Sequence, residues 1–171
     1  MMKEEIVNRV AKSNLITIDL EDYYTDNPRT VLDIKNWLFQ GLILKEREFR
    51  DTLNDFDWRQ LENHHIALQC TSEAIIPAWA YMLIQTHLEG IAKTVVVGSL
   101  ENLDAFIYKS TIEQLDLSFC KDKSVMIKGC AHKPVPQNAY LMLIQKLQPL
   151  AKSIMYGEAC SSVPLFKKKK I

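Results

Sequence analysis

Residues 64–70, His-His-Ile-Ala-Leu-Gln-Cys, begin the stretch of sequence that decides the fold. From here to residue 157, short runs of apolar and β-branched residues alternate with longer segments of helical periodicity. Strands are predicted over residues 65–69, 94–97, 124–128 and 153–156, and helices over residues 77–90, 101–115 and 136–151. Alternating strands and helices form parallel sheets. The sequence therefore predicts an α/β fold with a three-layer, mostly parallel sheet and helices on both faces.

An internal repeat supports this order of elements. Residues 77–84 resemble residues 136–143, and residues 92–98 resemble residues 151–157, both at an offset of 59 positions. Each segment of the first pair begins with a proline in the first turn of a predicted helix, where the missing N–H costs no hydrogen bond. Each segment of the second pair begins with Ala-Lys and ends with a glycine, on either side of a predicted strand. We therefore predict two similar β-α-β units in residues 64–157.

The residues that precede the repeat are less regular. Residues 3–12 have the apolar spacing of a short amphipathic helix, and residues 15–20 alternate as a strand does. Residues 30–34 are predicted to form a second strand that pairs back on the first as a hairpin. A helix is predicted from about residue 45 to residue 56, where aromatic and leucine side chains share one face.

A single α/β domain is predicted for residues 1–171, because this length suits one hydrophobic core. Residues 1–63 form its N-terminal part (a helix, a strand or hairpin, and a helix), and residues 64–166 form the repeated region. Residues 167–171 contain four consecutive lysines and are predicted to be a solvated basic tail.

The composition excludes several classes of protein. Hydrophobic residues make up 47% and charged residues 25% of the chain, which is typical of a soluble globular protein. Lys and Arg number 21 and Asp and Glu number 21, so no overall basic field attracts nucleic acid. No apolar run reaches the roughly 18 residues of a membrane span. We expect a cytoplasmic protein without nucleic-acid or membrane partners, in which the thiols stay reduced.

The positions of the four cysteines carry the functional prediction. Cys70, Cys130 and Cys160 each follow the end of a predicted strand, whereas Cys120 precedes one. The carboxyl ends of parallel strands meet at one edge of a sheet, and open α/β sheets bind their ligands there. We therefore expect Cys70, Cys130 and Cys160 to converge at one edge. Cys120 is expected at the opposite edge, as a packing residue.

Three converging thiolates favour a bound cation. Their mutual repulsion is relieved by a metal ion, and three protein ligands leave one coordination position open. An all-sulfur set suits zinc, iron or an iron–sulfur cluster. The candidates for a fourth ligand are His132, Glu158, Glu73 and the adjacent Glu21 and Asp22, and none is favoured.

Two alternatives remain open from the residues alone. The cysteines could serve a sulfur carrier that works through a persulfide, or a thiol-redox carrier. They could also be small buried hydrophobes in an interaction module. His64 and His65 are expected to begin a strand and to be partly exposed. No nucleotide-binding motif or hydrolase motif is present, so no enzymatic activity and no catalytic residue are assigned.

Several strings of residues resemble the bacterial family catalogued as domain of unknown function 2480, and the resemblance covers the whole chain. It rests on EEIVNRV (residues 4–10), DIKNWLFQG (33–41), KGC with KPVP (128–130 and 133–136), and residues 151–165. The resemblance implies a family without an established activity, whose genes often lie beside those for iron–sulfur cluster assembly. It also implies that the family keeps the three strand-end cysteines and does not keep His132, which argues against His132 as a ligand.

These observations together predict a metal-binding or iron–sulfur-cluster-binding protein with Cys70, Cys130 and Cys160 as ligands. Its expected cofactor is zinc, iron or an iron–sulfur cluster. The resemblance implies a role as an accessory to iron–sulfur cluster assembly, with the assembly proteins as partners. A homodimer is left open.

Overall fold

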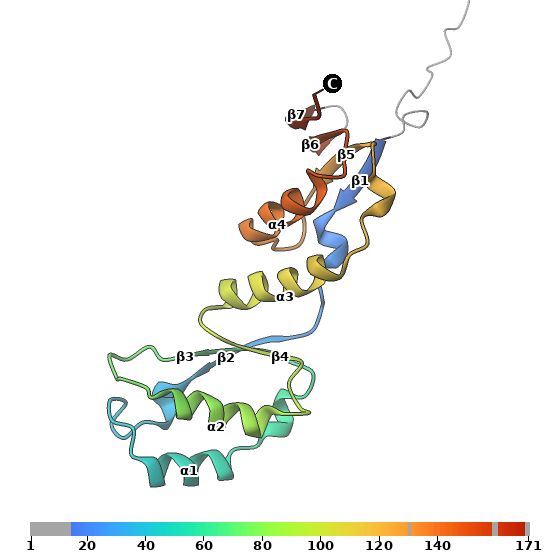
Figure 1. Ribbon diagram of the computed structural model, residues 1–171. Coiled ribbons are helices and arrows are strands. Elements are labelled where there is room, and N and C mark those ends of the chain that lie inside the picture. Colours follow the sequence, from blue (N-terminus) through green and yellow to red (C-terminus); the bar gives the residue numbers. More distant parts are fainter. Residues whose placement is uncertain (1–14, 130, 159–160, 170–171) are drawn as a thin grey trace, which may run out of the picture. The chain divides into compact units, whose positions relative to one another are not determined.

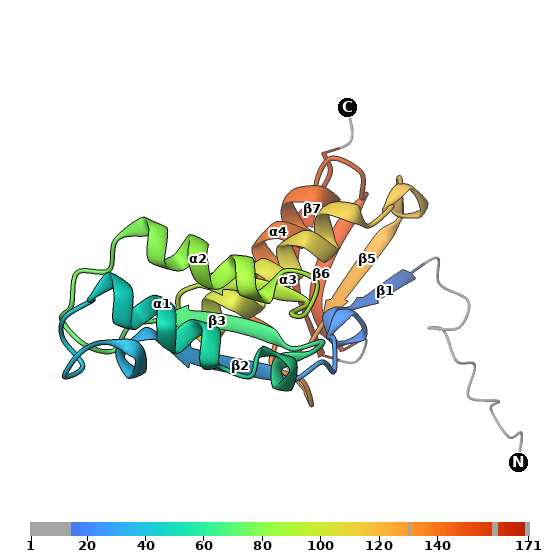
Figure 2. The same ribbon diagram turned by 90° about the horizontal axis from the view of Figure 1, so that it is seen from below.

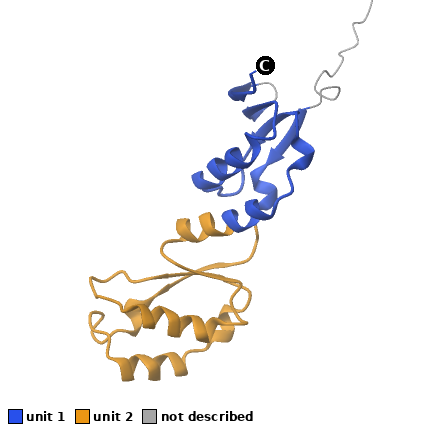
Figure 3. Cartoon of the chain, in the orientation of Figure 1, with its two compact units in different colours: residues 1–24, 108–171 blue, residues 25–107 orange. Residues whose placement is uncertain are grey.

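The computed structural model describes residues 15–129, 131–158 and 161–169, and the helix predicted for residues 3–12 lies outside these ranges. The chain forms two compact units (Figure 3). Unit 1 comprises residues 1–24 and 108–171, and unit 2 comprises residues 25–107. The single domain over residues 1–171 stays a prediction. Among the described residues, no helix is long and apolar enough to cross a membrane.

Unit 2 contains a three-stranded parallel sheet in the order β2-β3-β4. Helices α1 and α2 pack together on one face of this sheet (Figure 1), the face that carries Ile66 and Leu68. On the other face, Ala67 packs against Leu103 and Ile107 from the first half of α3. Helices therefore cover both faces of the sheet. The elements are β2 (Arg29–Asp33), η2 (Ile34–Trp37), α1 (Glu46–Asp55), η3 (Trp58–Leu61), β3 (His65–Gln69), α2 (Ala78–Leu88), β4 (Thr94–Val97) and α3 (Leu100–Gln114).

Unit 1 contains a four-stranded sheet in the order β1-β5-β6-β7, and Figure 2 shows its strands side by side. The first three strands are parallel, whereas β7 runs antiparallel to β6. The second half of α3 and helix α4 supply the core on one face, including Tyr108, Ile112 and Leu143. The further elements are β1 (Leu15–Asp19), η1 (Leu20–Tyr23), η4 (Ser118–Cys120), β5 (Ser124–Lys128), α4 (Gln137–Leu147), β6 (Ser153–Glu158) and β7 (Ser161–Lys167).

The α/β class and the order of elements are confirmed, and the bounds predicted for β3, β4 and β5 are those of the structure. Three details are wrong. The strands form two sheets and not one, because β5 pairs with β1 and β6 and not with β4. The N-terminal hairpin does not form, since β2 pairs in parallel with β3. Finally, a strand that was not predicted, β7, follows β6; its last residue, Lys167, is exposed, as the other described lysines of the basic tail are.

The internal repeat is present in the structure and is longer than the sequence comparison indicated. Strands β3 and β5, helices α2 and α4, and strands β4 and β6 begin 59 residues apart. Strands β2 and β1 occupy equivalent places, because Arg29 pairs with His65 as Leu15 pairs with Ser124. In both halves of the repeat, the sheet therefore contains one more strand, which comes earlier in the chain and pairs in parallel with the first strand of the β-α-β segment.

The cores of the two units match position by position. At the same offset, Phe49 corresponds to Tyr108 and Leu53 to Ile112, so α1 is equivalent to the second half of α3. The equivalence reaches the backbone, since Asn63 has a φ of 61° and its counterpart Asp122 has a φ of 56°. Further buried pairs are Leu61 and Cys120, Ile66 and Val125, Leu68 and Ile127, Ala80 and Ala139, Ile84 and Leu143, and Leu88 and Leu147.

Candidate functional site

The carboxyl ends of β5 and β6 lie close together in unit 1. The two strands are adjacent and parallel, with Ile127 paired to Tyr156. Just beyond this pair, the Lys128 Nζ lies 2.7 Å from a Glu158 carboxylate oxygen. The hydrogen bond to Glu158 raises the pKa of Lys128, partial burial opposes it, and the charges of Glu158, Asp19 and Glu21 add to the rise. An ion pair therefore spans the edge at which ligand binding was predicted.

Glu21 fixes the loop that follows β5. Its carboxylate accepts hydrogen bonds from the backbone N–H groups of Ala131 and, at 2.9 Å, of His132. The pKa of Glu21 is lowered, mainly by the hydrogen bond from the His132 N–H. Partial burial opposes this shift, and the N–H groups of Ala131 and Lys133 lower the pKa further. Glu21, two residues after the end of β1, thus makes hydrogen bonds to a loop that lies more than a hundred residues later in the chain.

Gly129 directly follows β5 and has a conformation that a side chain would strain. Its φ is 150°, and a Cβ atom at this position would lie 2.7 Å from the Tyr140 hydroxyl oxygen and 3.3 Å from the Leu20 Cβ. The backbone before Cys130 therefore passes directly beside the Tyr140 hydroxyl, and this close approach needs a glycine.

Cys130 and Cys160, two of the three predicted ligands, lie outside the described residues. The residues that flank them are described. Cys130 follows Gly129, two positions after Lys128, and Cys160 lies two positions after Glu158 in the connection from β6 to β7. Both cysteines are therefore two residues beyond a partner of the same ion pair.

Cys70, the third predicted ligand, follows β3 in unit 2. The expectation that one sheet edge carries all three cysteines is wrong, because β3 belongs to a different sheet from β5 and β6. Cys70 is half-buried, and its sulfur lies 3.2 Å from the Ser72 hydroxyl oxygen. Burial raises the pKa of Tyr81, and its electrostatic interaction with Cys70 adds to the rise.

Cys120 is a packing residue, as expected. It is fully buried in the core of unit 1, and burial raises the pKa of its thiol while the charge of Lys123 opposes the rise. Its counterpart in unit 2 is the buried Leu61. The same position in the repeat thus takes a leucine or a cysteine.

The candidates for a fourth ligand are dispersed. Glu158 pairs with Lys128, and Glu21 accepts backbone N–H groups. Glu73 lies in unit 2, where its side chain is exposed. Among residues 15–129, 131–158 and 161–169, no three His, Cys, Asp or Glu side chains are grouped so that they could hold a metal ion.

The sequence analysis missed a carboxylate at the equivalent edge of unit 2. Asp33 ends β2 and accepts hydrogen bonds from the backbone N–H of Lys35 at 3.0 Å and that of Thr71 at 3.1 Å, and from the Thr71 hydroxyl. Partial burial raises the pKa of Asp33, but these hydrogen bonds outweigh it and the pKa is lowered. In the repeat, Asp33 corresponds to Asp19 and Thr71 corresponds to Cys130.

One of the two histidines was misjudged, since His64 is partly exposed and His65 begins β3 as expected, but His65 is not partly exposed. His65 is buried, 2% exposed, and its Nε2 lies 3.0 Å from the Thr25 hydroxyl. Beside it, Arg29 Nε and an Asp104 carboxylate oxygen are 2.6 Å apart. Burial lowers the pKa of His65, the charges of Arg29 and Lys93 lower it further, and Asp104 opposes them. The pairing of β2 with β3 creates this polar cluster, so the His-His dipeptide alone could not indicate it.

Comparisons with known proteins give a family and no activity. No curated protein and no solved structure matches the chain. A family model described as a protein of unknown function (DUF2480) matches residues 4–168, which includes both units and all four cysteines. The chain therefore belongs to the DUF2480 family of proteins of unknown function.

Proposed function

We propose that unit 1 binds a metal ion or an iron–sulfur cluster, with Cys130 and Cys160 as the central pair of ligands. The observation that supports this is the placement of both cysteines two residues beyond the Lys128–Glu158 ion pair. Thiolates that follow adjacent parallel strands emerge at the same edge of the sheet. Sulfur ligands suit zinc, iron and iron–sulfur clusters.

The repeat supplies a candidate for a neighbouring oxygen ligand. In unit 2 the side chain of Thr71 reaches the carboxylate of Asp33 at the end of β2. Cys130 takes the place of Thr71, and Asp19 takes the place of Asp33, because β1 and β5 pair in the same register as β2 and β3. We infer that Cys130 and Asp19 supply one sulfur and one oxygen ligand to the same cation, which offsets the repulsion between the two anionic groups.

Asp19 suits this role better than the other carboxylates of the edge. One of its oxygens accepts the Glu21 backbone N–H at 3.0 Å, which fixes the orientation of the side chain. Glu158 already neutralises Lys128, and Glu21 already accepts hydrogen bonds from two backbone N–H groups. Cys70 remains a proposed third ligand, and proteins of iron–sulfur cluster assembly remain the proposed partners.

Metal analysis of protein purified without air tests the proposal. We expect about one equivalent of zinc, or iron in the amount of one cluster, together with absorption in the visible range if a cluster is present. Cys130→Ser and Cys160→Ser should each lower the metal content. Cys70→Ser is the matched comparison: unchanged metal content confines the ligands to unit 1, and lowered content adds Cys70 to the set.

Two results would contradict the proposal. The first is the absence of zinc and iron from the wild-type protein after growth and purification with both metals supplied. The second is a metal content that the Cys130 and Cys160 substitutions leave unchanged. Rapid alkylation of one cysteine in the metal-free protein at neutral pH, with persulfide detected on it, would assign the pair to a sulfur carrier instead.

A further inference from the structure

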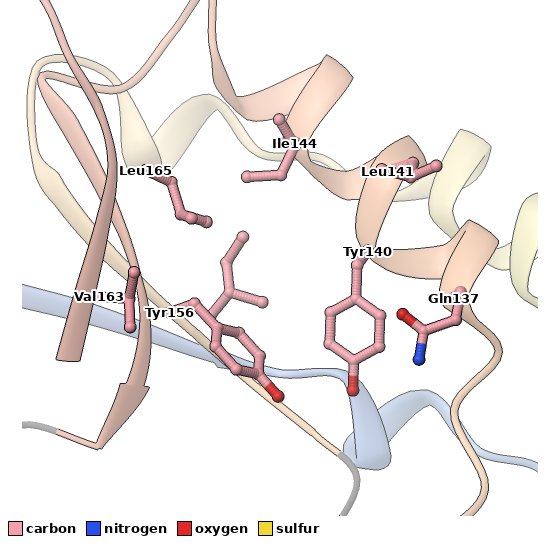
Figure 4. Close-up of a pocket in the computed structure, with 8 residues that line it drawn as sticks. Gln137, Tyr140, Leu141, Ile144, Tyr156, Val163 and Leu165 are labelled. Carbon is pink, nitrogen blue, oxygen red and sulfur yellow. The ribbon is translucent and has the colours of Figure 1, made fainter. Parts of the chain in front are cut away.

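A pocket of about 480 Å³ lies in unit 1 between α4 and the outer strands of the sheet (Figure 4). Strand β5 contributes its floor, α4 one wall, and β6 and β7 the other. The lining residues are Ile127, Gln137, Tyr140, Leu141, Ile144, Tyr156, Val163 and Leu165. Volumes of this size are typical of sites for small molecules.

The antiparallel strand β7 creates the wall opposite α4. Val163 pairs with Tyr156 across the β6–β7 ladder, and a bulge between Ile154 and Met155 interrupts the register farther along. Val163 and Leu165 are 58% and 51% exposed, although both are apolar. On the other wall, Leu141 of α4 is 68% exposed. Apolar side chains thus face an open space from both sides.

The polar groups of the pocket lie at one end. Figure 4 shows the hydroxyl groups of Tyr140 and Tyr156 directed to the same side, with the amide of Gln137 beside Tyr140. The two tyrosine rings meet edge to face, with centroids 5.8 Å apart and an interplanar angle of 80°. The remaining lining side chains are aliphatic, and none of the eight is charged.

The repeat shows that the fold alone does not require this pocket. Unit 2 has the same β-α-β unit, but Val97 stands where unit 1 has Tyr156, and Gln85 stands where it has Ile144. The described sheet of unit 2 ends at β4 and has no strand equivalent to β7. Tyr156, Ile144 and the extra strand β7 are therefore additions specific to unit 1.

We propose that this pocket binds a small, uncharged molecule with an apolar body and a hydrogen-bonding group at one end. The apolar body contacts Ile144, Leu165 and Val163, and the hydrogen-bonding group reaches the hydroxyls of Tyr140 and Tyr156. The lining offers no charged side chain to pair with an ionic ligand, so it favours a neutral one. This proposal does not depend on the cysteine site.

Fluorescence titration with N-phenyl-1-naphthylamine tests the proposal. This neutral probe has two aromatic groups and one N–H donor, and its fluorescence rises in an apolar site. We expect saturable binding of one probe per chain. The double substitution Ile144→Gln with Tyr156→Val copies the residues of unit 2, so the fold should tolerate it, and it should weaken binding at least about tenfold.

Two further variants complete the design. The reverse exchange in unit 2, Gln85→Ile with Val97→Tyr, is the matched control and should leave probe affinity unchanged. If the double variant of unit 1 does not fold by circular dichroism, Leu141→Asn replaces it, because that side chain is exposed. The sulfonated probe 8-anilino-1-naphthalenesulfonate should bind more weakly than the neutral one.

Three results would overturn the proposal. The first is equal affinity of the wild-type protein and the folded pocket variants for the neutral probe. The second is binding of the sulfonated probe at least as tight as that of the neutral probe. The third is a wild-type dimer that becomes a monomer in the pocket variants by light scattering, which would assign this face to a second copy of the chain.

Discussion

Replacing Gly129 by alanine tests the close approach between the end of β5 and Tyr140. The φ of 150° is a conformation that L-residues rarely adopt, and it costs an alanine about 1–3 kcal/mol. The added Cβ would also lie 2.7 Å from the Tyr140 hydroxyl oxygen, so that side chain has to move. Overpacking of this kind costs about 1–3 kcal/mol, whereas the lower entropy of the unfolded alanine chain returns about 0.4–1 kcal/mol. We expect a net destabilisation of about 3 kcal/mol.

Two reference variants separate the two causes. Gly90 also has a positive φ, 72°, but a Cβ there meets nothing within 4 Å. Gly90→Ala should therefore cost only about 1 kcal/mol, from backbone strain alone. Adding Tyr140→Phe to Gly129→Ala removes the oxygen at 2.7 Å and should restore about 1 kcal/mol, because the next ring atom lies at 3.4 Å.

Urea unfolding followed by two probes measures these changes. All three tryptophans, Trp37, Trp58 and Trp79, belong to unit 2, so their fluorescence reports on that unit, whereas far-ultraviolet circular dichroism reports on both. Gly129→Ala should shift the transition seen by circular dichroism. The reasoning is refuted if Gly129→Ala costs no more than Gly90→Ala, or if Tyr140→Phe leaves the Gly129→Ala variant unchanged.

Three other predictions concern His65, Tyr108 and the Asp33–Thr71 pair. Because the pKa of His65 is lowered in the folded state, the unfolded chain binds protons more readily. The stability of unit 2 should therefore fall as the pH drops below about 6.5, and His65→Gln should flatten this dependence in tryptophan-monitored urea unfolding at pH 5.5 and 7.5. Tyr108→Phe removes a buried hydrogen bond of 3.1 Å to the Leu20 carbonyl oxygen and should cost about 1.5 kcal/mol; a loss below about 0.5 kcal/mol by circular dichroism would contradict this. Asp33→Ala removes the acceptor for Thr71 and should lower the stability of unit 2 by about 1 kcal/mol, measured by tryptophan fluorescence. Thr71→Val should give a smaller loss.

Local periodicity was sufficient to find most elements of the fold. The apolar strands β3, β4 and β5 are bounded by residues that end strands, and the repeat placed Pro77 and Pro136, and Gly98 and Gly157, at equivalent points. The partition into two sheets was not predictable in this way. β1 and β2 have similar patterns, and nothing within either pattern states which distant strand it will pair with.

Strand β7 was missed for a related reason. Its residues alternate weakly, Pro164 interrupts them, and five of its seven residues are exposed in a row before Phe166. Such a segment resembles a loop until an edge strand is available to pair with it. The pocket was missed with it, because that wall exists only when β7 lies beside β6.

The candidate site shows the same division. The sequence alone determined that Cys130 and Cys160 follow strand ends and that Cys120 does not, because strand ends are local features. Only the tertiary structure decided that β3, which precedes Cys70, belongs to another sheet. It also decided that Lys128 and Glu158, each two residues before one of the other cysteines in the sequence, form an ion pair. A strand's place in a sheet depends on hydrogen bonds to segments far away in the chain. Sequence periodicity indicates which face of a strand is apolar, but it does not indicate which strand will pair with it.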